Sequence, residues 1–222
     1  WAALAAQRQY TGYQLFQTRY EKKYKKALGE GCPRMNSDIE QTVYLLGMLS
    51  GLQAMTNDIN SGGAVQVPKD IAAVVERGMT CLDNTKFWGA PNATRAVIWT
   101  LLPGAGDGKP DPYQTLKQSV QIGEQKGVRL SHALYAVAAQ ASGDDAKIRD
   151  ALRTFDQARS DEKPVNPQFK LIDSMAAIMV NGISDRYWTE NTGIRSADDG
   201  MQTFWDETDN SSELDDLFSA DL

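Results

Sequence analysis

The chain has 222 residues, of which 41% are hydrophobic, and its net charge is −6. This length lies near the upper limit of a single domain, since chains divide into several domains beyond roughly 250 to 300 residues. No stretch approaches the roughly 20 consecutive apolar residues of a membrane span, so the sequence as given predicts no integral membrane protein. The first residue is Trp1 rather than Met, which leaves open a signal peptide or a lipidated leader upstream of it.

Apolar residues recur at intervals of three and four along most of the chain, which is the period of an amphipathic α-helix. Ser37 followed by Glu40 is a capping-box pattern that opens one such helix. Within it, Gly47 and Gly51 lie one turn apart, and the absence of two side chains favours the close approach of a neighbouring helix. The first helix carries an aromatic series, Tyr10, Tyr13, Phe16, Tyr20 and Tyr24.

Strand signals are nearly absent, so we predict an all-α fold. Very short turns at Gly127 and Gly143 make the neighbouring helices antiparallel. Antiparallel helical hairpins fit either a closed bundle or a short solenoid, and we favour the solenoid. The eight expected helices cover residues up to 28, 39–55, 68–81, 91–101, 113–125, 129–140, 144–158 and 169–187.

Charge divides the chain into two parts. Residues 190–222 contain ten acidic residues and one basic residue, Arg195, whereas residues 1–189 carry about +3. We predict a helical domain over 1–189 and an acidic C-terminal tail over 190–222. The tail is either disordered or docked through its apolar residues. These residues are Phe204, Trp205, Leu214, Leu217 and Phe218.

The main basic cluster lies near the end of the first helix. Because charged runs on helices are usually solvated, and phosphate binding needs basic residues gathered on one binding face, we expect no nucleic-acid partner. The cluster consists of Arg19, Lys22, Lys23, Lys25 and Lys26, interleaved with Tyr20 and Tyr24.

The two cysteines, Cys32 and Cys81, lie in a turn and at a helix end. We predict that they form a disulfide, which favours an oxidising compartment; the alternative is a pair of free cytosolic thiols. No metal site is expected, because the chain has no CxxC or HxxxH pattern and a single histidine, His132. That histidine, in an Ala- and Leu-rich helix, is expected to be packed rather than catalytic. The glycine-rich loop 104–109 lacks the spacing of a phosphate-binding loop, so no nucleotide cofactor is expected.

Carboxylates next to tryptophans are the best enzymatic signal. Acidic groups desolvated in such a groove have a raised pKa, as general acid catalysis on sugars requires. A second aromatic group could form either a core plug or the wall of a ligand site. The first set is Asp185, Trp188, Glu190, Trp205, Asp206 and Glu207, and the second is Phe87, Trp88 and Trp99.

Four short segments follow one another along the chain: Tyr44-Leu-Leu-Gly47, Cys81-Leu-Asp-Asn84, Phe87-Trp-Gly89 and Pro103-Gly-Ala-Gly-Asp-Gly108. Their layout resembles the T component of TRAP transporters. The resemblance covers roughly residues 40 to 158, and it implies periplasmic, lipid-anchored proteins built from tetratricopeptide-like hairpins. Such proteins associate with a substrate-binding partner and can form trimers, and the resemblance implies no catalytic residues.

We therefore expect a non-enzymatic, extracytoplasmic helical scaffold without a cofactor. Its hairpins would present a groove or central cavity to a protein partner or a small apolar ligand, and it could assemble as a homo-oligomer. Two alternatives stay open: a carboxylate-dependent glycan hydrolase and a cytosolic helical-repeat adaptor.

Overall fold

A computed structural model describes residues 1–159, 164–197 and 200–207 of the chain. Within these residues the chain forms eight α-helices and no strand, so the all-α prediction is confirmed. The helices are α1 (Ala2–Tyr24), α2 (Asp38–Asn60), α3 (Ile71–Met79), α4 (Ala90–Leu101), α5 (Pro112–Lys126), α6 (Leu130–Ser142), α7 (Asp145–Gln157) and α8 (Lys170–Thr192), with a short 3-10 turn, Pro167–Phe169, before α8.

Most helix ends follow from local sequence. The Ser37 side chain accepts a hydrogen bond of 3.2 Å from the backbone N–H of Glu40, as the capping-box pattern predicts. Gly127 and Gly143 adopt left-handed conformations at the ends of α5 and α6. The first helix ends earlier than expected, at Tyr24 rather than at 28, because Lys25 itself takes the left-handed conformation (φ 54°).

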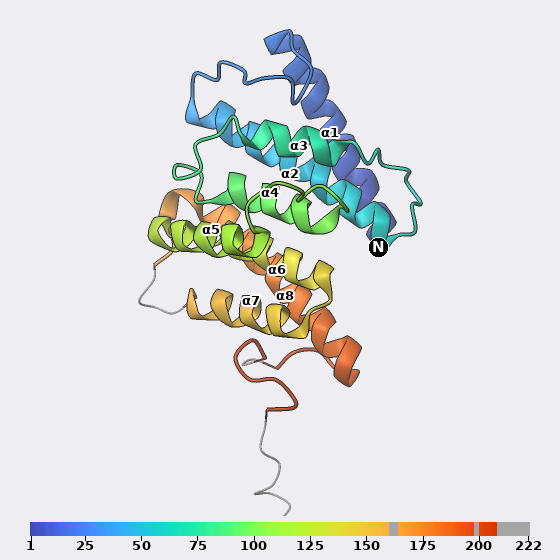
Figure 1. The fold of residues 1–222 in the computed structure, drawn as a ribbon, viewed down its shortest axis with the longest axis vertical. Helices are drawn as coiled ribbons and strands as arrows, with labels where there is room; N and C mark the ends of the chain where they lie inside the picture. Colours follow the sequence, from blue (N-terminus) through green and yellow to red (C-terminus); the bar gives the residue numbers. More distant parts are fainter. Residues whose placement is uncertain (160–163, 198–199, 208–222) are drawn as a thin grey trace, which may run out of the picture.

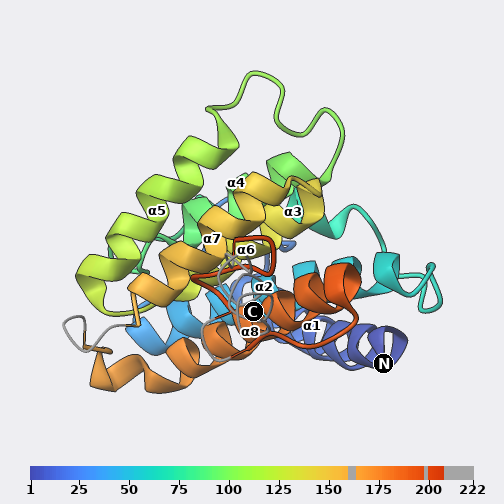
Figure 2. The same cartoon turned by 90° about the horizontal axis from the view of Figure 1, so that it is seen from below.

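The helices follow one another along the long axis of the molecule, from α1 at one end to α7 and α8 at the other (Figure 1). Each helix packs against the next, and α4–α6 and α6–α8 also contact each other directly. Helices α2, α4, α6 and α8 line a common hollow, and we call them the inner layer. Direct contacts of α4 with α6 and of α6 with α8 fit a short solenoid or bundle. The helix lengths vary from 9 to 23 residues, so they follow no fixed repeat. Seen from below, α8 lies on the same side as α1 and α2 (Figure 2).

Part of the predicted tail packs onto the helical body. Helix α8 continues to Thr192, past the expected domain boundary at 189, and residues 200–207 pack against α7 and α8. Phe204 is fully buried, and the guanidinium groups of Arg149 and Arg153 lie 4.8 and 5.0 Å from its ring centre. Residues 208–222, with Leu214, Leu217 and Phe218, lie outside the described part of the chain.

Gly47 and Gly51 are the places where α1 approaches α2 most closely. A Cβ atom at Gly47 would lie 2.5 Å from the Phe16 ring, and one at Gly51 would lie 2.5 Å from the Tyr13 ring. Both distances are shorter than real carbon contacts, so the predicted close approach is confirmed. The aromatic series of α1 therefore packs onto the glycine face of α2.

We expect Gly51→Leu to lower the free energy of unfolding by about 1 to 3 kcal/mol, because the new side chain overpacks the Tyr13 and Ile71 contacts. Chemical denaturation of the purified variant measures this loss. The matched control is Gly182→Ala on α8, where an added Cβ meets nothing within 4 Å. That control should gain up to about 1 kcal/mol from helix propensity alone. A stable Gly51→Leu variant would contradict the close packing of α1 on α2.

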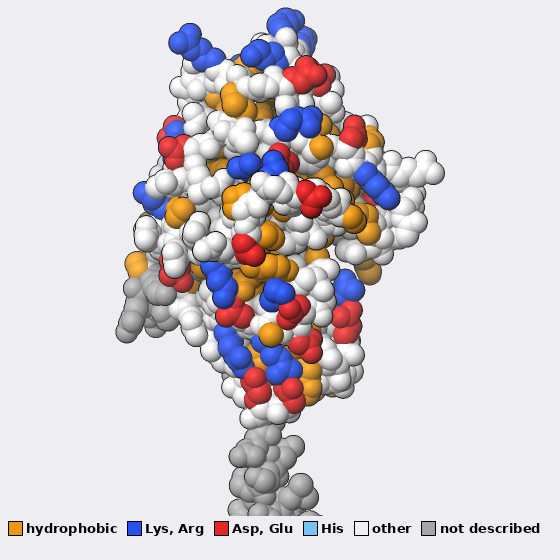
Figure 3. Space-filling view, viewed as in Figure 1, with side chains coloured by type: hydrophobic (Ala, Val, Ile, Leu, Met, Phe, Trp, Pro, Cys, Tyr) orange, Lys and Arg blue, Asp and Glu red, His pale blue; other side chains and the backbone are white. Residues whose placement is uncertain are grey.

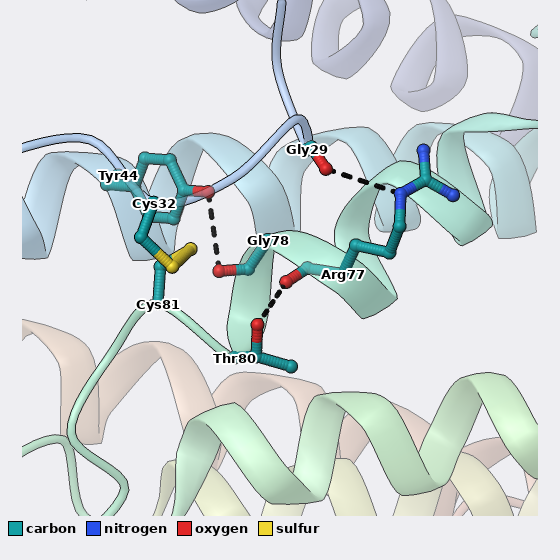
Figure 4. The surroundings of a disulfide bond; sticks show 7 residues. All are labelled: Gly29, Cys32, Tyr44, Arg77, Gly78, Thr80 and Cys81. Atoms are coloured by element: carbon teal, nitrogen blue, oxygen red, sulfur yellow. Dashed lines mark hydrogen bonds between the residues drawn. A yellow bond between two sulfur atoms is a disulfide. The ribbon is translucent and has the colours of Figure 1, made fainter.

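The disulfide between Cys32 and Cys81 is present, as predicted (Figure 4). It joins the α1–α2 connection to the turn after α3, with the Cα atoms 5.1 Å apart. Two further links support the same junction. The Tyr44 hydroxyl donates to the carbonyl of Gly78 (3.3 Å), and Arg77 Nε donates to the carbonyl of Gly29 (3.3 Å).

Candidate functional site

The main hollow of the described structure is a groove on the inner layer of helices, with a volume of about 520 Å³. Ligand pockets in proteins have volumes of roughly 300 to 1,000 Å³. We call this hollow the central groove. It is lined by side chains of α2, α4, α6 and α8, together with Gln9 of α1. The site is therefore formed by helices that are far apart in the sequence.

The walls of the central groove are apolar. Each of the four helices contributes residues spaced three or four apart, so one stripe of each helix faces the groove. Most of these side chains are buried, and their burial leaves little freedom to close the hollow by rotation. The apolar lining consists of Leu49 and Leu52 of α2, Val97 and Leu101 of α4, Leu130, Leu134 and Val137 of α6, and Met179 and Ile183 of α8.

Uncharged polar groups form one rim, where α1 meets α2. The carboxamides of Gln9, Gln53 and Asn57 lie in one connected group, which we call the amide triad. The Gln9 carboxamide lies 2.8 Å from Asn57 Nδ2 and 3.4 Å from that of Gln53. The Ser50 hydroxyl donates to the backbone carbonyl of Gln9 (3.0 Å) and holds α1 in place. The rim thus offers hydrogen-bond donors and acceptors without charge.

Helix α8 reaches across the groove to α2. The Gln53 amide contacts the sulfur of Met179 at 3.7 Å, between residues 126 positions apart in sequence. The methionine side chain is flexible and can repack around different occupants. The amide triad and Met179 therefore meet where α2 and α8 both line the groove.

The lining contains no acid–base or nucleophilic pair. Among the described residues that line the groove, none is His, Cys, Asp, Glu or Lys, and the single charged one is Arg186. Its Nε donates to Glu190 (2.7 Å) in an exposed pair along α8. The lining therefore combines apolar side chains with uncharged polar groups and one guanidinium.

The aromatic residues Phe87, Trp88 and Trp99 do not line the groove. Phe87 and Trp88 are each 2% exposed and lie in the core, where Trp88 packs edge-on against Phe169 with ring centres 4.5 Å apart. Trp99 points away from the groove on α4, and its Nε1 donates to Glu76 (3.3 Å). The sequence left two roles open for these aromatic residues. Phe87 and Trp88 form a core plug and not the wall of a ligand site.

Trp188 and Trp205 do come together, outside the groove. Their ring centres are 5.2 Å apart, and Trp188 Nε1 donates to the carbonyl of Gly200 (2.7 Å). This contact anchors residues 200–207 to α8. Asp185 lies close by and accepts a hydrogen bond from the Ser196 hydroxyl (2.9 Å). These residues hold the end of the described chain on the body.

The neighbouring carboxylates are arginine-paired. Arg149 Nη2 lies 2.8 Å from Asp206, and its hydrogen bond lowers the pKa of that carboxyl below the usual range. Arg153 Nη2 lies 2.6 Å from Glu207, and this hydrogen bond likewise lowers the pKa of Glu207. A general acid needs a raised pKa at neutral pH, so neither carboxyl is suited to the general-acid role.

His132 is packed, as expected, with its side chain fully buried in α6. Its Nε2 lies 3.6 Å from Glu124, and its ring stands edge-on to Phe155. Across the described residues, no group of three or more His, Cys, Asp or Glu side chains is arranged to hold a metal ion. No helix of the described part is long and apolar enough to cross a membrane.

The lining residues of the central groove were not predicted from the sequence. One feature that indicates such a groove is α2, because this helix is apolar on nearly all sides although it has only two neighbours along the chain. One apolar side, including Met48, packs inside the core, and another, including Leu52, faces the groove. A helix that is apolar all round must be covered on every side, so α2 predicts a second apolar contact surface.

Comparison with known proteins adds no relative. No protein-family model, no curated protein and no solved structure matches the chain. The geometry of the central groove therefore carries the functional inference.

Proposed function

We propose that this chain is a non-enzymatic, extracytoplasmic helical binding protein whose central groove holds a small, uncharged and mainly apolar ligand. The observation that carries the proposal is the groove itself: about 520 Å³, apolar walls from four helices, and an uncharged amide triad at the rim. The apolar walls supply the binding free energy through burial. The amide triad supplies orientation for a hydroxyl or carbonyl group of the ligand.

An accessory role in solute transport fits this site. The resemblance to the T component of TRAP transporters implies tetratricopeptide-like hairpins and a periplasmic, lipid-anchored protein that works beside a substrate-binding partner. A groove that holds an uncharged ligand without acid–base groups is compatible with capture and transfer rather than chemistry. The Cys32–Cys81 disulfide supports an extracytoplasmic location over a cytosolic adaptor.

The test uses a neutral apolar fluorophore, N-phenyl-1-naphthylamine, titrated into the purified chain. We expect one bound molecule per chain, with enhanced fluorescence. Val137→Trp on α6 should fill part of the groove and weaken binding by about tenfold or more, which corresponds to about 1.4 kcal/mol. Native mass spectrometry of protein from its own compartment should show a bound neutral molecule that this variant lacks.

The matched control is Ile178→Trp on α8. Ile178 is 71% exposed and does not line the groove, so the same bulky side chain is added outside the site. We expect this variant to bind the fluorophore as the unchanged chain does. If both variants bind alike, the fluorophore occupies another place and the proposed site is wrong.

A further inference from the structure

A second hollow lies at the opposite pole of the molecule from the end of the described chain. It is a shallow groove of about 190 Å³ between the C-terminal half of α1 and the N-terminal half of α2. Its apolar lining includes Ile39 and Val43, which are 76% and 54% exposed. We call this hollow the end groove. Its apolar lining is Phe16, Tyr20, Tyr24, Met35, Ile39 and Val43.

Basic side chains lie in and near the end groove: Arg19 and Lys23 line it together with one acidic residue, Glu40. Figure 3 shows Lys and Arg side chains gathered at the end of the molecule that the C-terminus of α1 forms. Lys23 pairs with Glu40 beside the hollow; among the described residues, the other four members of the cluster make no ion pair. Exposed apolar surface beside a mostly unpaired basic cluster favours an occupant that is both apolar and acidic. The cluster is Arg19, Lys22, Lys23, Lys25 and Lys26.

Residues 208–222 of the same chain have this chemistry. They contain five acidic residues and no Lys or Arg. Their apolar residues Leu214, Leu217, Phe218 and Leu222 follow one another at intervals of three, one and four. They would share one face if the segment became helical on a partner. Short amphipathic helices that present such anchors bind hydrophobic grooves. The acidic residues are Asp209, Glu213, Asp215, Asp216 and Asp221.

The end groove and the start of the acidic segment lie at opposite ends of the molecule, which favours a second copy of the chain as the partner. The C-terminal end of α1 and the N-terminal end of α2, which form the end groove, lie at the top of Figure 1. Residues 200–207, which lead into the acidic segment, are anchored at the bottom. We propose that residues 208–222 of one chain dock in the end groove of a second copy. Such a contact joins different surfaces of the two copies, so it links chains head to tail. The resulting assembly is either a closed ring or an open row of copies. The basic cluster at this end of one copy then lies near the five acidic residues of the other.

Sedimentation velocity of the full chain tests this proposal. We expect association at concentrations up to about 0.2 mM, weakened about tenfold between about 0.05 and 0.5 M salt, because the charges are exposed. Val43→Asp, which damages the end groove, and Leu217→Asp with Phe218→Asp, which damages the segment, should each weaken association by about thirtyfold or more. Circular dichroism should show that all variants stay folded.

Mixing the two damaged chains gives the sharpest result. The first still has an intact segment and the second an intact end groove, so an equimolar mixture should form one-to-one dimers and nothing larger. A symmetric contact between like surfaces would not be rescued in this way. The control is Leu15→Asp, which changes an exposed leucine of α1 outside the end groove and should associate normally.

Three outcomes would overturn the proposal. The unchanged chain could stay monomeric at both salt concentrations, the mixture could fail to dimerise, or Leu15→Asp could be as damaging as Val43→Asp. Anionic phospholipid vesicles and single-stranded RNA serve as competing probes. One of these probes could bind the monomeric chain but fail to bind the double variant Lys22→Glu, Lys26→Glu. In that case the basic end of the molecule binds a membrane or a nucleic acid instead.

Discussion

Replacing Cys32 and Cys81 by serine should lower the free energy of unfolding by about 4 kcal/mol. The disulfide joins positions 49 apart in sequence. A cross-link that closes a loop of this length removes conformational entropy from the unfolded chain, which corresponds to about 4 kcal/mol at 25 °C. Urea or guanidinium denaturation of the oxidised chain and the double variant measures the difference.

The reduced form of the unchanged chain is the matched control. If the stabilisation comes from the cross-link, reduction with a dithiol should reproduce the loss seen in the double serine variant. A difference below about 1 kcal/mol between oxidised and reduced protein would contradict the entropic account. Two free thiols in protein taken from its native compartment, found by mass spectrometry without reduction, would contradict the extracytoplasmic proposal as well.

Removing the carboxylate of Asp173 should cost about 3 to 5 kcal/mol, because it leaves a nearly buried guanidinium without its partner. Asp173 lies on α8 with 3% of its surface exposed, and Arg129 precedes α6. Both the backbone N–H and the Nε of Arg129 donate to Asp173 Oδ1 at 2.9 Å, and a second guanidinium nitrogen contacts Oδ2. Denaturation of Asp173→Ala, compared with Glu190→Ala in an exposed pair, measures the effect.

Glu190→Ala should lose less than about 1 kcal/mol, since exposed ion pairs contribute little. Changing both partners, Asp173→Leu with Arg129→Met, should cost clearly less than Asp173→Ala alone, because no charge is then left buried. Equal losses in Asp173→Ala and Glu190→Ala would show that the α6–α8 junction does not depend on this pair.

The same pair gives the stability a defined pH dependence. Burial alone would raise the pKa of Asp173, but the hydrogen bonds from Arg129 outweigh it and lower this pKa below its ordinary value of about 3.9. The unfolded chain therefore binds this proton first as the pH falls, so the contribution is complete above about pH 5 and disappears through the lowered folded pKa. The difference in unfolding free energy between the unchanged chain and Asp173→Ala should shrink below pH 4. A constant difference down to pH 2 would contradict it.

Local sequence already predicted the helices, their caps and the disulfide. The i to i+4 hydrogen bonds of a helix and its capping groups involve residues within one or two turns, so the aromatic series of α1 and the Ser37 cap are readable from neighbouring positions. Two cysteines allow a single pairing, which is why Cys32 and Cys81 were predictable. Gly47 and Gly51 indicated close packing because a glycine inside a helix is costly without such a use.

The central groove and the surroundings of the tryptophans depended on packing between distant positions. The groove requires a stripe of each inner helix to face the same space, and the angle at which each helix turns is set by side-chain contacts across the fold, such as Gln53 with Met179. Trp88 and Trp188 look alike in sequence as candidates for a ligand wall. The segment that covers each ring is decided by its neighbours in space. Phe169 packs on Trp88, and residues 200–207 pack on Trp188. Burial of apolar area lowers the free energy whichever segment supplies it, so the sequence around each tryptophan does not predict its cover.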